Sequence, residues 1–405
     1  MNDEPPRVVI TGLGIVSPLG RGTDSFWRGL LEGRSAVDVL SHIDMAGTPA
    51  PPGAPVRDYT PPAGLGPSLA SVRRSHVFAV DAALQAQSDA RLPIDAATAG
   101  QVAVVVGTAL GGDPSGPVAA ALGVQGPAFT ALAGAASGTW AVGLGAAMIR
   151  RGQARAAFCG GTEAPLTAEV LRDFDARSLL SHRHDDPAGT CRPFDVARDG
   201  TVLGEGAAFL VLEERDLALS RRATVYAEVV GFGAAYQPAS PAAGPASAQE
   251  ESALGAGEPD PVLAGRALQM ALMEKPLLQG EIDLYWACGS AIAEHDKLEV
   301  ATVKRVFGGG AYRLTLTACK GATGHLLGAS GALEAAACAL ALKNQSVPPA
   351  VNCEKPDPAC DLDIVRGEPR QERLAHAMSY VFGIDLPAGQ AGGHHACLIL
   401  AAPGD

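Results

Sequence analysis

The pattern of apolar residues in the first half of the chain predicts strands that alternate with helices. The runs at 7–20 and 101–112, RVVITGLGIVSPLG and QVAVVVGTALGG, contain β-branched stretches that end in glycine, which is typical of buried strands followed by turns. A third such run, ARAAFCGGTEA, lies at 154–164, and residues 77–92 have a helical pattern. Strands separated by helices predict an α/β sheet.

The second half of the chain repeats this alternation. Its predicted elements are a helix at 262–275, a strand at 283–290, a helix at 295–308 and a final strand at 396–402. The segment 237–261 is poor in β-branched and aromatic residues, which predicts a surface loop. We therefore expect an N-terminal half at 1–236, this loop, and a C-terminal half at 262–405.

Composition and charge narrow the classes of partner. The formal net charge of -12 disfavours a nucleic-acid partner, and the N-terminus lacks the pattern of a secretory signal, so we expect a cytoplasmic protein. The eight cysteines form no CxxC pairs, which argues against disulfides and zinc. Residues 130–149 carry no charge, but they are rich in alanine and glycine, which favours a buried helix over a membrane span. The segment 47–67, rich in proline and glycine, is predicted to be a surface excursion.

Several motifs occur in a fixed order along almost the whole chain. They are VVITGLGIVSPLG at 8–20, GGTEA at 160–164, RPFDVARDGTVLGEGAAFLVLEE at 192–214, RVFG at 305–308, GHLLGASGALEA at 324–335 preceded by Lys320, and LALKNQSVPPAVNCEKPDPACDLD at 340–363. In these motifs the chain resembles the β-ketoacyl synthases of the thiolase superfamily. The resemblance implies a five-layered α-β-α-β-α fold made of two similar halves, usually dimeric across a strand near the active-site helix.

The chemistry of this family requires a cysteine thiolate, two histidines, a supporting lysine and an oxyanion hole. The family nucleophile lies a fixed distance before the GGTEA motif, at the start of a central helix whose dipole lowers a thiol pKa. In this chain that position falls on Ala135, and the following Ser137 and Gly138 match the family. Alanine cannot form a thioester, so we predict that the condensing nucleophile has been lost.

Of the other catalytic groups of the family, one histidine and the oxyanion hole are also altered. Counting back from Lys320 places Cys288 where the resemblance implies the first catalytic histidine, whereas Lys320 and the second histidine, His325, are retained. The glycine-rich loop that contributes to the oxyanion hole begins at Phe382 and Gly383, but continues as IDLPAGQAGGHH where the family has a short Gly-Gly-Thr-Asn turn. The oxyanion hole is therefore predicted to be altered.

A shortened segment is a further departure from the family. Only the thirteen residues 113–125 lie between Gly112 and Gly126, where relatives have a longer segment that crosses the dimer interface and helps to close the partner's acyl tunnel. We hypothesise that the shortening leaves the partner's tunnel open-ended and allows longer or stiffer products.

These departures predict a chain length factor, the ketosynthase-like subunit without cysteine found in type II polyketide synthases. The expected partners are a cysteine-containing ketosynthase, as a heterodimer, and an acyl carrier protein whose phosphopantetheine arm holds the substrate. No cofactor, metal, nucleic acid or membrane is expected. Polyene, aromatic polyketide and fatty-acid products are all compatible with the sequence, as is a degenerate homodimer.

Two catalytic alternatives remain open from the sequence. One is a malonyl-carrier-protein decarboxylase that supplies starter units, although that chemistry requires both histidines. The other is acyl transfer through Cys288 as a relocated nucleophile, against which a small buried packing residue is the simpler interpretation. Trp140 and Trp286 flank the altered positions and either fill the former pocket or pack in the core. His394 and His395 are adjacent and should point to opposite faces, so we do not predict a metal pair.

Overall fold

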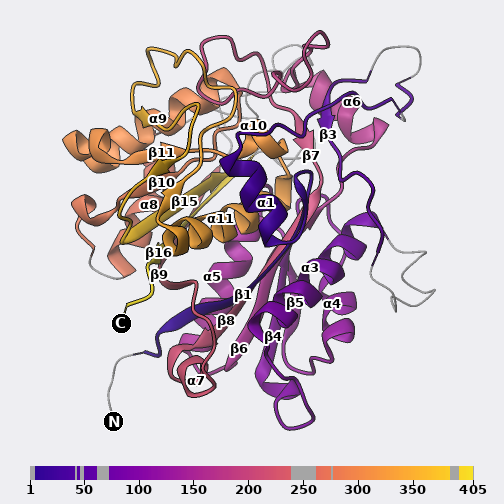
Figure 1. Cartoon of the computed structure of the whole chain (residues 1–405), viewed down its shortest axis with the longest axis vertical. Helices are drawn as coiled ribbons and strands as arrows, with labels where there is room; N and C mark the ends of the chain where they lie inside the picture. Colours follow the sequence, from indigo (N-terminus) through magenta and orange to yellow (C-terminus); the bar gives the residue numbers. More distant parts are fainter. Residues whose placement is uncertain are drawn as a thin grey trace.

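The computed structural model describes residues 5–41, 43–45, 50–61, 73–238, 261–274, 277–383 and 392–404. Within these residues the main feature is a sheet of twelve strands in the order β13-β11-β10-β15-β16-β9-β1-β8-β6-β4-β5, with β2 paired to β1 (Figure 1). The strands are β1 (Val8–Ser17), β2 (Gly20–Arg21), β4 (Val102–Gly107), β5 (Ala128–Ala131), β6 (Ala156–Glu163), β8 (Gly206–Glu214), β9 (Ala227–Pro238), β10 (Leu284–Trp286), β11 (Thr315–Thr317), β13 (Asp363–Ile364), β15 (His376–Phe382) and β16 (Gly392–Ala401).

Two short strand pairs lie outside this sheet, and helices pack on the outside of its two halves and between them. The pairs are β3 (Gly53–Ala54) with β7 (Leu203–Gly204), and β12 (Ser346–Val347) with β14 (Arg370–Gln371). The helices are α1 (Thr23–Leu31), α3 (Arg74–Ala90), α4 (Ser115–Leu122), α5 (Ser137–Arg150), α6 (Ala168–Ala176), α7 (Arg215–Ser220), α8 (Pro261–Glu274), α9 (Ala293–Phe307), α10 (Lys320–Thr323) and α11 (Ser330–Asn344).

The sheet consists of two halves that meet at β1 and β9. Three antiparallel residue pairs, from Val8 opposite Val229 to Ile10 opposite Ala227, join the two halves. Helix α3 packs on β1, β8 and β6 of the first half, whereas α8 packs on β9 and β16 of the second. Helices α5 and α11 lie between the halves and contact strands of both (Figure 1). The predicted α/β fold with helices outside and between two similar halves is confirmed.

Small residues allow the two central helices to approach closely. A Cβ added to Gly138 of α5 would lie 2.7 Å from the backbone nitrogen of Ala332 in α11 and 2.9 Å from the carbonyl oxygen of Gly328. Every residue of α11 from Ser330 to Leu342 is buried. The alanine and glycine content of the chain therefore reflects close packing of helices, as the composition indicates.

The structure corrects the sequence-based assignment in several places. Residues 50–54, within the predicted surface excursion, are buried and include β3, because proline and glycine report backbone geometry rather than exposure. The uncharged stretch 130–149 is helical only from Ser137, because its first residues end β5. Strands β9 and β15 had not been predicted. The interior of the predicted loop at 237–261, and residues 384–391 after Gly383, lie outside the described residues.

Candidate active site

Ala135, which the sequence analysis assigns to the position of the family nucleophile, lies directly before α5. The chain leaves β5, turns at Gly134 with a φ of +54°, and enters α5 after Ala136. The hydroxyl of Ser137 fixes this turn, because it accepts the N–H of Ala133 at 2.8 Å and lies 2.6 Å from the carbonyl oxygen of Gly134. Ala135 is completely buried. The turn and the helix start that would activate a thiol are present, but the side chain is a methyl group.

Cys288 follows β10, and its backbone is held by a buried carboxyl group. The backbone N–H groups of Cys288 and Gly289 donate to the two carboxyl oxygens of Glu299, at 2.7 and 2.9 Å, and the hydroxyl of Tyr285 lies 3.1 Å away. Burial raises the pKa of Glu299 to about 8, and these backbone donors oppose the rise. Glu299 thus fixes the loop that carries Cys288.

The thiol of Cys288 is 1% exposed and is packed in the same buried cluster as Ala135 and Phe382. The backbone N–H of Phe382 is close enough to the sulfur to favour the thiolate form. Burial raises the pKa of the Cys288 thiol well above its ordinary value, although the charge of Lys320 works in the opposite direction. The structure therefore brings Ala135, Cys288 and Phe382 together and keeps the thiol protonated.

Lys320 forms a buried ion pair beneath these positions. Its Nζ lies 2.5 Å from Oε1 of Glu334 and donates to the carbonyl oxygen of Cys288 at 2.6 Å, and both charged side chains are at most 1% exposed. Burial disfavours the charge on Lys320, but nearby groups, including Glu334, outweigh this effect and raise its pKa. Burial raises the pKa of Glu334 to about 7 against the opposing charge of Lys320. Two protein groups thus hold the ammonium group of Lys320.

His325 is completely buried, and its neutral ring accepts a hydrogen bond. Its Nδ1 accepts the backbone N–H of Leu327 at 3.0 Å, so the ring proton lies on Nε2, which has no hydrogen-bond partner. Burial lowers the pKa of His325 well below its usual value, and the charges of Lys320 and His295 add to the effect. The backbone of His325 bonds to Val202 and Gly204, which anchors it to β7.

Phe382, at the end of β15, is surrounded by aromatic rings. The ring of His295 meets it edge-on at 5.5 Å between centroids, and the ring of His395 stacks at 6.0 Å. His395 also contacts the hydroxyl of Tyr380 through Nδ1 at 2.7 Å, whereas His394 lies against Tyr236. The two adjacent histidines of β16 therefore contact different neighbours, as expected for an extended segment.

The sequence analysis did not identify His295 as part of this site. His295 is 6% exposed, its Nδ1 has no hydrogen-bond partner, and burial lowers its pKa to about 4. Its only sequence signal is its position seven residues after Cys288. Of the two tryptophans, Trp140 packs against Phe232 beside the cluster that contains Ala135, whereas Trp286 lies in a different buried cluster.

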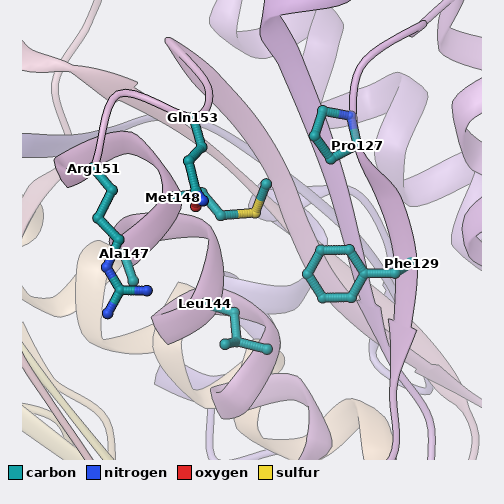
Figure 2. A pocket seen from close by; sticks show the side chains of 7 residues that line it. All are labelled: Pro127, Phe129, Leu144, Ala147, Met148, Arg151 and Gln153. Carbon is teal, nitrogen blue, oxygen red and sulfur yellow. The ribbon is translucent and has the colours of Figure 1, made fainter.

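A separate apolar hollow lies beside the outer edge of the sheet. Within the described residues β5 ends the strand order, and Phe129 and Leu132 are 37% and 62% exposed there. Figure 2 shows the hollow between β5 and α5, which has a volume of about 390 Å³. It is lined by Pro127, Phe129, Leu144, Ala147, Met148, Arg151 and Gln153. Both the exposed strand edge and the hollow are features of an unpartnered apolar face.

The described residues contain neither a membrane-spanning helix nor a cluster of metal ligands. No helix among them is long and apolar enough to cross a membrane. They also contain no group of three or more histidine, cysteine, aspartate or glutamate residues arranged to hold a metal ion.

The two-half sheet, the central helices and the buried Lys320 and His325 define a thiolase-like ketosynthase fold. Two family models match the chain: "Beta-ketoacyl synthase, N-terminal domain" over residues 6–114 and 63–218, and "Beta-ketoacyl synthase, C-terminal domain" over 241–354. The chain belongs to the β-ketoacyl synthase family.

Relatives of known name cover almost the whole chain. The 3-oxoacyl-[acyl-carrier-protein] synthase 2 of Coxiella burnetii is 34% identical over 98% of this chain and 99% of its own length, and that of Synechocystis sp. is 34% identical over 98% of both chains. Among solved structures, the ishigamide ketosynthase/chain length factor is 29% identical with a TM-score of 0.83, covering 99% of this chain and 100% of its own. A type II PKS acyl-carrier protein in complex with its ketosynthase contains a chain that is 26% identical with a TM-score of 0.83, over 99% of this chain and 100% of its own.

Proposed function

We propose that this chain is a non-condensing subunit of the chain-length-factor type. It pairs with a cysteine-containing ketosynthase and shapes the cavity for an acyl chain carried by an acyl carrier protein. The observation that carries the proposal is Ala135, a buried methyl group at the start of α5 where condensation requires a thiolate. Cys288 in place of the first histidine removes a second part of the same chemistry.

The exposed edge of β5 supports the pairing. Within the described part of the chain the outer edge of β5 is unpaired and the strand carries no charge. Phe129 of β5 and Leu132, directly after it, are exposed there, which favours contact with another subunit. The adjacent 390 Å³ hollow adds an apolar surface that a partner would cover. The similarity to a ketosynthase/chain length factor and to a ketosynthase in complex with its carrier protein supports the same kinds of partner.

Acyl transfer through Cys288 receives less support. Its thiol is buried in an apolar cluster, and its raised pKa keeps it protonated, whereas a nucleophilic cysteine needs a thiolate. The adjacent charge of Lys320 is already compensated by Glu334. Cys288 therefore acts as a packing residue in this proposal.

The short segment 113–125 is the structural basis of the proposed effect on chain length. It forms α4, capped by Gly123 with a φ of +71°, and leads directly into β5. Because so short a segment has little chain available to close a partner's tunnel, we expect longer products from the complex than from one with a longer segment grafted at this position.

The test is co-expression of this chain with cysteine-containing ketosynthases of the same organism. The expected result is a stable heterodimer whose product length, measured by mass spectrometry, decreases when a longer segment replaces 113–125. A chain that forms no complex with any of these ketosynthases, or a graft that leaves product length unchanged in an intact complex, would contradict the proposal.

A charge on the edge strand tests the interface. Phe129→Glu should reduce heterodimer affinity by about 100-fold or more, because an unpaired carboxylate would be buried in the contact. Met273→Glu is the matched control, since Met273 is 77% exposed on α8, which packs on the other half of the sheet. Equal affinities of the two variants would place the interface elsewhere.

A further inference from the structure

One face of α5 is only partly covered by the described chain. Along this face the residues recur at helical spacing and are half-buried or exposed, whereas most other positions of the helix are buried. They are Trp140, Leu144, Ala147, Met148 and Arg151. The last four of them line the hollow in Figure 2, across from Pro127 and Phe129. A helix face with this spacing normally packs against a further element.

Arg151 brings a positive charge to this hollow. Its guanidinium forms no ion pair with a carboxylate in the described part of the chain, whereas Arg150 lies 2.5 Å from Glu274 and Arg155 lies 4.0 Å from Glu214. The remaining lining residues are uncharged, and all of them except Gln153 are apolar. The hollow therefore combines apolar walls with one exposed cation.

We propose that the partner subunit fills this hollow with a bulky apolar side chain and places a carboxylate on Arg151. The inference rests on the proposed function and names the chemistry of the ketosynthase surface that this chain recognises. A volume of about 390 Å³ is large enough for a leucine, methionine or phenylalanine side chain, and the flexible thioether of Met148 can adapt to its shape. Arginine is also enriched at protein interfaces, where its planar fork binds carboxylates.

The edge of β5 by itself would discriminate poorly among partners. Its backbone groups can pair with any strand, so specificity at such an edge comes from side-chain pockets. Phe129 belongs both to this strand and to the wall of the hollow, so a strand paired with β5 would carry its side chains over the hollow. A ketosynthase with a basic residue there would bring like charges together. The hollow and Arg151 thus select the partner that the strand edge accepts.

The charge is tested by measuring the affinity of the co-expressed ketosynthase for variants of this chain. Arg151→Glu should lower the affinity at least about 10-fold at low ionic strength, and the difference should shrink as NaCl is added. Arg155→Glu is the matched control, because Arg155 is also exposed but does not line the hollow. Replacing one acidic residue of the ketosynthase with lysine should restore the affinity of Arg151→Glu.

The apolar part is tested by filling the hollow without changing the charge. Ala147→Trp should lower the affinity about 10-fold, because the indole would occupy the space of the partner's side chain. Gln269→Trp is the control, since Gln269 is exposed on α8, which packs on the other half of the sheet. Circular dichroism verifies that each variant folds, and Ala147→Leu replaces Ala147→Trp if the latter does not.

The outcomes separate this inference from the proposed function. A wild-type heterodimer whose affinity is affected no more by Arg151→Glu and Ala147→Trp than by their controls would overturn this inference alone. No heterodimer from the wild type would overturn the proposed function and this inference with it. Two other occupants of the hollow would also overturn it if the heterodimer is unaffected by Arg151→Glu. One is a second copy of this chain, detected as self-association that Arg151→Glu weakens, and the other is a free carboxylate, detected as binding of decanoate that Arg151→Glu abolishes.

Discussion

Removing Glu334 alone from the buried Lys320–Glu334 pair should destabilise the protein far more than removing both side chains. Both side chains are at most 1% exposed, and the carboxylate lies 2.5 Å from the ammonium. Glu334→Leu leaves a buried ammonium whose remaining partner is the carbonyl oxygen of Cys288. Such an uncompensated charge costs about 3–5 kcal/mol. For a chain of 405 residues this corresponds to a decrease in melting temperature of about 5 °C.

The reverse variant, Lys320→Met, should depend on pH. The remaining carboxyl group of Glu334 can accept a proton, and burial already raises its pKa to about 7. The variant should therefore lose little stability at pH 6, where Glu334 is neutral. Loss of the Lys320 charge should raise the pKa of Glu334 further, because that charge lowers it in the wild type. Relative to the wild type the variant should therefore lose more stability at pH 8, by up to about 1.4 kcal/mol for each pH unit between about 7 and its own higher pKa.

Thermal unfolding followed by circular dichroism at pH 6 and pH 8 measures these effects. The double variant Lys320→Met/Glu334→Leu should unfold within about 1 kcal/mol of the wild type, because apolar side chains of similar volume replace both charges. The control is Lys297→Met, which breaks an exposed pair with Glu294 at 3.0 Å and should cost at most about 0.5 kcal/mol. A double variant as unstable as the sum of the two single variants would refute the reasoning.

Three further predictions concern pH, packing and the lost nucleophile. Burial raises the pKa of Glu299 from 4.5 to about 8, so the contribution of Glu299 to stability is present below pH 4.5 and is lost as the pH rises through 8. Glu299→Gln should therefore flatten the decline in melting temperature between pH 5 and 8.5. A decline parallel to that of the wild type would contradict this prediction. Gly138→Ala should lower the melting temperature by several degrees, because its Cβ would lie 2.9 Å from the carbonyl oxygen of Gly328. Gly116→Ala is the control and should change the melting temperature by less than about 1 °C, since the nearest atom, Oδ2 of Asp113, would lie 3.8 Å from its Cβ. Similar shifts for the two variants would rule out the packing argument. Ala135→Cys should react with iodoacetamide faster than the eight buried native cysteines, and labelling no faster than the wild type would show that the start of α5 does not activate a thiol.

The sequence predicted the fold class because its family motifs fall on the elements that form the sheet and the central helices. It did not predict β9, whose run AEVVGFGAAYQP contains glycine and alanine that disfavour a strand in isolation. This strand forms because it pairs with β16 along ten residues and with β1 along three. Pairing partners so distant in the chain are not visible in a local pattern.

The candidate site was only partly predictable for a similar reason. Ala135, Cys288, Lys320 and His325 could be located because each lies at a fixed spacing from a motif. His295 could not, since its direction depends on a turn in which Gly289 and Ala291 both have positive φ, at +50° and +64°. That turn sets the start of α9 and with it the side of the helix that faces Phe382.

The presence of Lys320 is weak evidence for catalysis, because losing Lys320 would cost more stability than losing a thiol at position 135. A thiol at position 135 can be replaced by a methyl group at little cost in stability, because a small buried side chain fills the same cluster. Lys320 cannot be lost alone without leaving Glu334 buried and unpaired, so it can persist for structural reasons. His295 has no such partner in the described structure, since its Nδ1 bonds to nothing. Of Lys320, Glu334 and His295, it is therefore His295 whose burial the described contacts explain least.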